Sequence, residues 1–250
     1  MDATSDRIHP TKKFRPIASG KLPMVLAVFE MLGFIVLSLL LAATLKELFL
    51  GLVLTYLGIQ FIYSLGIKNI SVIDILVIAA GFIIRVYGGA VVIDAHLSVW
   101  FLLCVVSASL FLAAGKRRAE MNLLESFLGK TRKSLTKYSK ELLNSYVTMF
   151  GNAAWMSWAL YTFFESPKAS LDFWLALAEL SRATTINKLM MLTIPVVIFG
   201  IMRYEALIFE GKSEAPEKLL LTDKGLISAV VIWTVMVYWL LYSGVSVTGI

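Results

Sequence analysis

Long apolar runs separated by short polar segments form the pattern of this chain. A helix needs roughly 20 apolar residues to cross the hydrocarbon core of a bilayer. Seven stretches qualify, at approximately residues 22–44, 47–66, 70–93, 97–115, 146–164, 186–202 and 225–246. Within lipid every backbone N–H and C=O must be bonded internally, so each stretch is expected to be helical even where Val and Ile are frequent. The pattern therefore predicts an all-α, polytopic membrane helix bundle of about seven transmembrane helices.

Three smaller features modify this pattern. Residues 170–181 are apolar but too short to span, which predicts an interfacial helix on the outer surface. Residues 119–145 carry apolar side chains at helical spacing, which predicts a cytoplasmic helical excursion that is broken near Gly129. Pro195 is expected to kink its span. We expect one membrane-embedded domain over residues 1–250.

Composition excludes a soluble domain. Of the 250 residues, 58% are hydrophobic and only 16% are charged, whereas a soluble domain has about 45–50% apolar residues. The mean hydropathy is +0.80. The single cysteine, Cys104, lies within a span, so no intrachain disulfide can form and a packing role is expected.

Lysine and arginine are distributed unequally between the two sides that this topology predicts. One side holds 18 of the 23: five in residues 1–21, one at Lys68, eight in residues 116–140 and four in residues 203–224. The other side holds four, and Arg85 lies within a span. Because Lys and Arg are enriched in cytoplasmic loops, the first side is predicted to be cytoplasmic.

The first cytoplasmic segment combines carboxylates with cations. Asp2 and Asp6 are four residues apart, a spacing that places both on one face of a helix. Hard cations such as Mg²⁺ bind one or two carboxylates together with phosphate oxygens and water. Lys12, Lys13 and Arg15 follow closely and could bind the remaining oxygens of a metal-bound polyanion. The alternative is that the carboxylates are solvated and inert while the cations only set the topology.

Lys116, Arg117 and Arg118 directly follow the fourth apolar stretch. Three adjacent cations at a membrane surface are typical of a topology signal or of contact with anionic lipids. The functional alternative is a phosphate-binding site that faces residues 1–21. Both interpretations stay open on this pattern alone.

Ionisable residues also lie at the ends of spans and inside them. Lys68 lies at a predicted cytoplasmic end, Asp74 lies early in the next span and Arg85 lies deeper. Ionisable groups inside a span are costly and predict function by default, although Asp74 and Arg85 could instead form a hydrogen-bonded pair across helices. His9 and His96 lie on opposite sides in this topology and therefore cannot share a metal ion.

These residues resemble motifs of the UbiA superfamily, whose members are membrane-embedded transferases that act on polyprenyl substrates. Residues 2–20 resemble its first aspartate-rich motif and the basic segment that follows, and residues 63–68 (YSLGIK), with Asp74 and Arg85, are similar to another part of the pattern. The resemblance covers essentially the whole chain. It implies two four-helix halves plus one helix, around a cavity that opens to the cytoplasm and laterally to lipid.

A second set of residues resembles the decaprenyl-phosphate phosphoribosyltransferase branch of that superfamily. Residues 115–120 (GKRRAE) stand where members that use a prenyl diphosphate carry a second aspartate-rich motif. Arg203-Tyr204 and residues 211–224 (GKSEAPEKLLLTDK) also match this branch. Cations suit a reaction in which the lipid is a monophosphate and the diphosphate belongs to the sugar.

The resemblance implies that the phosphate of a polyprenyl (decaprenyl) phosphate attacks C1 of 5-phosphoribosyl 1-diphosphate and releases diphosphate. Asp2 and Asp6 would bind Mg²⁺, and Lys68 would join them in the catalytic set. The implied substrate-binding residues are Lys12, Lys13, Arg15, Lys116, Arg117, Arg118, Glu120 and Arg203. The expected partners are these two substrates and the cell membrane, with no nucleic acid, and the site is expected to face the cytoplasm.

The start of the chain differs from the family pattern. The family motif begins with an Asn-Asp pair shortly before Asp2 and follows two further spans, so we expect the chain to lack the first two of nine helices and one metal-binding aspartate. Two other functions stay open: a prenyltransferase that joins a prenyl diphosphate to an aromatic or other acceptor, and an inactive membrane scaffold. The basic residues 116–118 argue against the first.

Overall fold

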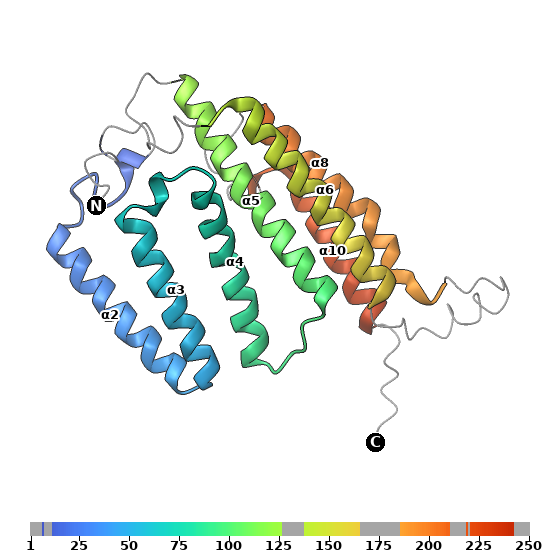
Figure 1. Ribbon diagram of the computed structural model, residues 1–250, viewed down its shortest axis with the longest axis horizontal. Helices are drawn as coiled ribbons and strands as arrows, with labels where there is room; N and C mark the ends of the chain where they lie inside the picture. The colour runs from blue at the N-terminus through green and yellow to red at the C-terminus, as the bar shows by residue number, and fades with distance from the viewer. Residues whose placement is uncertain are drawn as a thin grey trace. The chain divides into compact units, whose positions relative to one another are not determined.

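The computed structural model describes Arg7 and residues 12–126, 138–165, 186–210, 219 and 221–242. Within these residues the fold is all-α and contains no strand (Figure 1). Its α-helices are α2 (Met24–Ala43), α3 (Glu47–Leu65), α4 (Ile73–Val92), α5 (Val99–Ser126), α6 (Lys140–Phe164), α8 (Ile194–Phe209) and α10 (Lys224–Tyr242). Three 3₁₀-helices accompany them: η1 (Lys12–Phe14), η2 (Ile67–Asn69) and η4 (Ile186–Thr193).

Six of these helical segments are long and apolar enough to cross a membrane. They are α2, α3, α4, the part Val99–Asn122 of α5, the segment Leu189–Phe209 that includes α8, and α10. This confirms the predicted all-α, multi-pass membrane fold. The predicted span 146–164 falls on α6, which is not among these six.

The packing of α6 nevertheless places it alongside two of the spans. A side chain at Gly151 would lie 3.1 Å from Phe111 of α5 and 3.2 Å from Ile201 of α8. Nearer its other end, the hydroxyls of Ser157 and Ser107 are 3.4 Å apart. These contacts pack α6 against α5 and α8.

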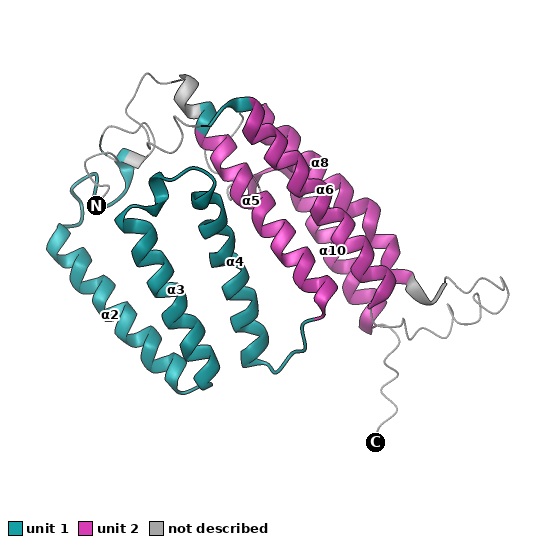
Figure 2. Ribbon diagram, viewed as in Figure 1, with its two compact units in different colours: residues 1–97, 121–140 teal, residues 98–120, 141–250 magenta. Residues whose placement is uncertain are grey.

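The chain divides into two compact units (Figure 2). Unit 1 comprises residues 1–97 and 121–140 and contains α2, α3 and α4. Few of its side chains are buried: Ala42 is the only buried residue of α2, and α3 has none. Apolar side chains that are exposed on membrane helices face lipid at no cost, because lipid tails are as apolar as they are.

Unit 2 comprises residues 98–120 and 141–250 and contains most of α5 and α6, together with α8 and α10. Two clusters form its core. One surrounds Phe111, Tyr204 and Ile208, and the other surrounds Trp158 and Leu240. In the second cluster Trp158 also donates a hydrogen bond from Nε1 to the hydroxyl of Thr193 at 2.9 Å.

One expectation about these helices is wrong. The fourth span does not end near residue 115, because α5 continues to Ser126 and carries the basic residues on the same helix. Pro195 occupies the first turn of α8, directly after η4, where its missing N–H would have no intrahelical partner. It lies within the candidate span Leu189–Phe209, and the kink at this position stays a prediction. The predicted interfacial helix at 170–181 and the break near Gly129 lie outside the described residues.

Replacing Gly115 by alanine should destabilise the fold. A Cβ atom there would lie 2.8 Å from Ile208 Cδ1 and 3.0 Å from the Tyr204 ring, so these buried side chains would have to shift or α5 and α8 would have to separate. Overpacking of this kind costs about 1–3 kcal/mol. Thermal unfolding in detergent would measure the loss, and Gly33→Ala on α2 is the matched control because nothing lies within 4 Å of its Cβ position. Equal melting temperatures for the two variants would contradict the prediction.

Candidate functional site

Two of the three predicted phosphate-binding cations on α5 are fully buried. Arg117 is 0% exposed and Arg118 is 1% exposed, whereas Lys116 is half-buried. Arg117 donates from Nη1 to Glu120 Oε2 one turn further along the helix and forms an ion pair with it. Because a buried charge without a partner is strongly destabilising, this pairing with the predicted site residue Glu120 helps Arg117 to stay ionised.

Arg118 is held by side chains from two other helices of unit 2. Its Nε donates to Asn144 Oδ1 of α6 at 2.5 Å. Its guanidinium also lies over the ring of Phe209 of α8, 5.7 Å from the ring centroid. A cation above an aromatic face is attracted by the ring quadrupole. The position of Arg118 is therefore fixed by α6 and α8 together.

The resulting arrangement keeps positive charge at one end of unit 2. Residues 116–118 and Glu120 carry three positive charges and one negative charge, and two of the cations are held rigidly. Fixed charges in a low-dielectric environment raise the local concentration of oppositely charged ligands. Half-buried Lys116 is the cation of this group that is most open to a phosphate.

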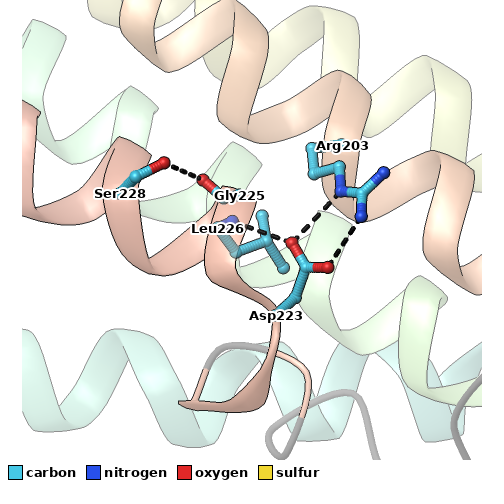
Figure 3. Close-up of polar contacts among 5 residues, drawn as sticks. All are labelled: Arg203, Asp223, Gly225, Leu226 and Ser228. Atoms are coloured by element: carbon cyan, nitrogen blue, oxygen red, sulfur yellow. Dashed lines mark hydrogen bonds and ion pairs between the residues drawn. The ribbon is translucent and has the colours of Figure 1, made fainter.

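Arg203, another predicted substrate-binding residue, forms a two-pronged ion pair (Figure 3). Its Nε donates to Asp223 Oδ1 at 3.1 Å and its Nη2 donates to Asp223 Oδ2 at 2.7 Å. This geometry matches the planar fork of guanidinium to carboxylate. The pair joins α8 to the start of α10, so two of the five N–H donors of Arg203 serve a contact within the protein.

Asp223 also caps α10. Its Oδ1 accepts a hydrogen bond from the Leu226 N–H at 2.9 Å, which is the usual contact between an N-cap carboxylate and the third residue of a helix. A side chain at Gly225 would lie 3.0 Å from Asp223 Oδ1 and 3.2 Å from Arg203 Nε. The absence of a side chain at residue 225 thus leaves room for the ion pair.

Unit 1 contains a second polar contact, which is centred on Asp74. This residue is 0% exposed, and the Tyr138 hydroxyl donates to its Oδ1 at 2.7 Å. The same hydroxyl accepts the Val72 N–H at 2.5 Å. Val72 is the N-cap of α4 and has φ of 70°, a left-handed conformation that is costly for a β-branched residue. Tyr138 therefore ties the end of the basic segment to the start of α4.

Lys68 lies in η2, three residues after α3 ends, and is half-buried. Unit 1 thus places it on the short connection that leads into the Val72–Asp74 turn. Lys13 is exposed within η1, and Arg15 is exposed directly after it. Lys12 opens η1. Asp2 and Asp6 lie outside the described residues.

The suggested pairing of Asp74 with Arg85 is wrong. Both residues lie on α4, and a rise of roughly 1.5 Å per residue separates them by about 16 Å along its axis. Arg85 instead donates from Nη2 to the Tyr56 hydroxyl of α3. Its guanidinium lies 4.9 Å from the centroid of the Tyr56 ring and 5.7 Å from that of Phe82.

No group of three or more His, Cys, Asp or Glu residues that could hold a metal ion occurs in the part of the chain that the structure describes. The magnesium prediction therefore depends on Asp2 and Asp6, which lie outside that part. At residues 116–118, α5 carries cations where a second carboxylate motif would stand.

Sequence reasoning missed three partners of these ionisable residues. Asn144 and Tyr138 belong to no sequence motif. Asn144 is 26 residues from its partner Arg118, and Tyr138 is 64 residues from its partner Asp74. Asp223 could have been found, because an aspartate immediately before an apolar run is a helix-start signal.

Comparison with known proteins supports a specific assignment for this arrangement. A family model described as the UbiA prenyltransferase family matches residues 1–178. A decaprenyl-phosphate phosphoribosyltransferase of Corynebacterium glutamicum is 34% identical over 244 residues, which cover 96% of this chain and 69% of the relative.

Two further relatives carry the same name. The protein of Mycolicibacterium smegmatis is 35% identical over 89% of this chain and 68% of its own length. The protein of Mycobacterium tuberculosis is 33% identical over 93% of this chain and 71% of its own length. These matches extend well beyond residue 178 and therefore include the α8 and α10 region.

Replacing Tyr138 by phenylalanine should destabilise the protein. The change removes the donor to buried Asp74 and the acceptor for the Val72 N–H, and unsatisfied buried polar groups cost about 1–3 kcal/mol each. Thermal unfolding in detergent would measure the effect. Tyr87→Phe is the control, because Tyr87 is 42% exposed on α4. A Tyr138→Phe variant as stable as the control would contradict the role of this hydroxyl.

The Arg203–Asp223 pair should contribute stability at neutral pH and lose that contribution only in strong acid. The guanidinium of Arg203, helped by the Leu226 N–H, lowers the pKa of the Asp223 carboxyl to about 2. A lowered pKa means that the stabilisation is complete above the ordinary value of about 4. The melting-temperature gap between the natural chain and Asp223→Asn should stay constant from pH 8 to pH 5 and shrink below about pH 4. A gap that already closes near pH 6 would refute this assignment.

Proposed function

We propose that this chain, which belongs to the UbiA prenyltransferase family, transfers 5-phosphoribose from 5-phosphoribosyl 1-diphosphate to a polyprenyl phosphate. The reaction releases diphosphate. The identity of 33–35% to decaprenyl-phosphate phosphoribosyltransferases, over 89–96% of the chain, carries this proposal. The basic group on α5 supports it, because that group suits a phosphorylated sugar.

The proposed reaction needs no strong general base. In the proposed step an oxygen of the lipid phosphate forms a bond to C1 of the ribose, and the bond from C1 to the diphosphate oxygen breaks. A phosphomonoester is already anionic near neutral pH, so the nucleophile needs no activation. The protein instead has to align the two reactants and stabilise the departing diphosphate.

The residues of unit 2 would provide one phosphate site. Lys116 would contact the 5-phosphate or the lipid phosphate directly, while Arg117 and Arg118 would contribute a fixed positive field from their buried positions. Glu120 would position Arg117. Arg203 would act mainly through its ion pair with Asp223, which fixes the position of the first turn of α10.

The segment that precedes α2 would provide the diphosphate site. Asp2 and Asp6 would hold Mg²⁺, which supplies positive charge to the diphosphate, and Lys12, Lys13 and Arg15 would complete the neutralisation. Lys68, on the connection between α3 and α4, would serve as the further catalytic cation. These sites would face the cytoplasm, because the predicted cytoplasmic loops carry the excess of Lys and Arg.

Transfer can be measured in membranes that contain the chain. Radiolabelled 5-phosphoribosyl 1-diphosphate, polyprenyl phosphate and Mg²⁺ should give label in the organic phase, and EDTA should abolish it. Lys116→Gln should lower kcat/KM roughly tenfold to a hundredfold, because a hydrogen bond to a charged group contributes about 1.5–3 kcal/mol. Lys224→Gln is the control, because Lys224 is an exposed cation at the start of α10.

Two results would overturn the proposal. Transfer of a prenyl group from a prenyl diphosphate, without incorporation of ribose, would identify a prenyltransferase. No transfer of either group by correctly inserted protein would favour an inactive scaffold. Full activity of the Lys116→Gln variant would remove only the role of that residue.

A further inference from the structure

The first half of α6 exposes a row of polar side chains. Ser145, Thr148 and Asn152 are all exposed and recur at helical spacing, so they form one stripe along the helix. Apolar side chains flank this stripe, with Leu142 37% exposed and Met149 51% exposed, and further along the helix the exposed side chains are apolar, as Met156 and Phe163 show. The polar stripe is therefore confined to the half of α6 that is nearer Asn144 and the basic group.

Glu205 of α8 adds a carboxylate to this stripe. The Thr148 hydroxyl donates to Glu205 Oε1, and Glu205 is half-buried. No residue that the structure describes donates to Glu205 Oε2. The carboxylate therefore keeps an accepting oxygen that is open to a ligand.

The depth of this group makes it unusual. Thr148 lies between Asn144, which bonds Arg118, and Gly151, which packs against Phe111 inside a span. Polar and ionisable side chains at such a level almost always face a polar cavity or a polar ligand, because hydrocarbon offers no hydrogen bonds. Thr148 donates to Glu205, and Asn152 Oδ1 accepts a hydrogen bond from Trp155 Nε1 at 3.3 Å. The remaining hydrogen-bonding capacity of the exposed stripe suits a polar occupant.

We propose that Thr148, Asn152 and Glu205 bind the ring hydroxyl groups of the ribose donor. This inference rests on the proposed function and deepens it. A carboxylate oxygen accepts hydrogen bonds from sugar hydroxyls, and the Asn152 amide both donates and accepts. The stripe contains no cation, so it suits hydroxyl groups and disfavours phosphate.

The spacing from the basic group fits one phosphorylated sugar. Asn144 precedes Thr148 by one turn of α6, and Phe209 follows Glu205 by one turn of α8. The Arg118 level and the Glu205 level are thus separated by roughly 5.4 Å, the pitch of an α-helix. A 5-phosphoribosyl group likewise has its phosphate at one end and its hydroxyls on the ring. A phosphate placed near the Arg118 level, in the field of the buried guanidinium, would therefore leave the ring hydroxyls at the Glu205 level.

The test compares ribose 5-phosphate with 2-deoxyribose 5-phosphate, both as ligands of the detergent-solubilised chain and as inhibitors of transfer. A site built to bond a hydroxyl rejects an analogue that lacks it. The natural chain should bind ribose 5-phosphate roughly tenfold or more tightly than the deoxy sugar. In Glu205→Leu and Asn152→Leu this ratio should fall toward one, while inhibition by diphosphate stays unchanged.

Glu30→Leu is the matched control, because Glu30 is an exposed carboxylate on α2 outside the proposed site. If the Glu205→Leu variant keeps the full discrimination while the natural chain transfers phosphoribose, this inference is wrong and the proposed function stands. A variant that keeps the discrimination but changes its oligomeric state would show that the stripe contacts a second copy. If the natural chain neither transfers phosphoribose nor binds ribose 5-phosphate, the proposed function fails and the inference fails with it.

Discussion

Lipid cannot hydrogen-bond to a protein, and this constraint governs every polar side chain that the chain carries among its membrane helices. A hydroxyl can bond a carbonyl of its own helix, as Thr55 does with Gly51, but the longer ionisable side chains take partners from other segments. Arg118 has Asn144 and the Phe209 ring, Asp74 has Tyr138, and Arg85 has Tyr56. Each of these contacts joins two segments of one unit, so the contacts that stabilise the charges also fix how those segments pack.

The same constraint leaves the basic residues in different surroundings. Arg203 directs two of its nitrogens to Asp223, and Arg117 is paired with Glu120. Lys116 and Lys68 remain half-buried. A group of basic residues that looks uniform in the sequence therefore contains members with different physical tasks, and the membership of the chain in the UbiA family does not by itself tell them apart.

The helices and their topology could be predicted from the sequence because hydropathy and the distribution of Lys and Arg are local properties. The extension of α5 to Ser126 was missed because its last turns are charged and a hydropathy pattern ends where apolar residues end. The position of Pro195 in the first turn of α8 was missed because proline breaks a helix interior and also favours a helix start. The pairing of Tyr138 with Asp74 could not be predicted from residue spacing, because it depends on tertiary packing between residues that are 64 positions apart in the chain.

The continuity of α5 has a consequence for how it presents its charges. Lys116, Arg117 and Arg118 are consecutive on a helix, and consecutive side chains on a helix point roughly 100° apart. Neighbours in the chain are thus divergent in space, which is why Arg117 meets Glu120 and Arg118 meets Asn144. A single phosphate can therefore be contacted directly by only one of these three side chains. The other two can act on it only through their electric field.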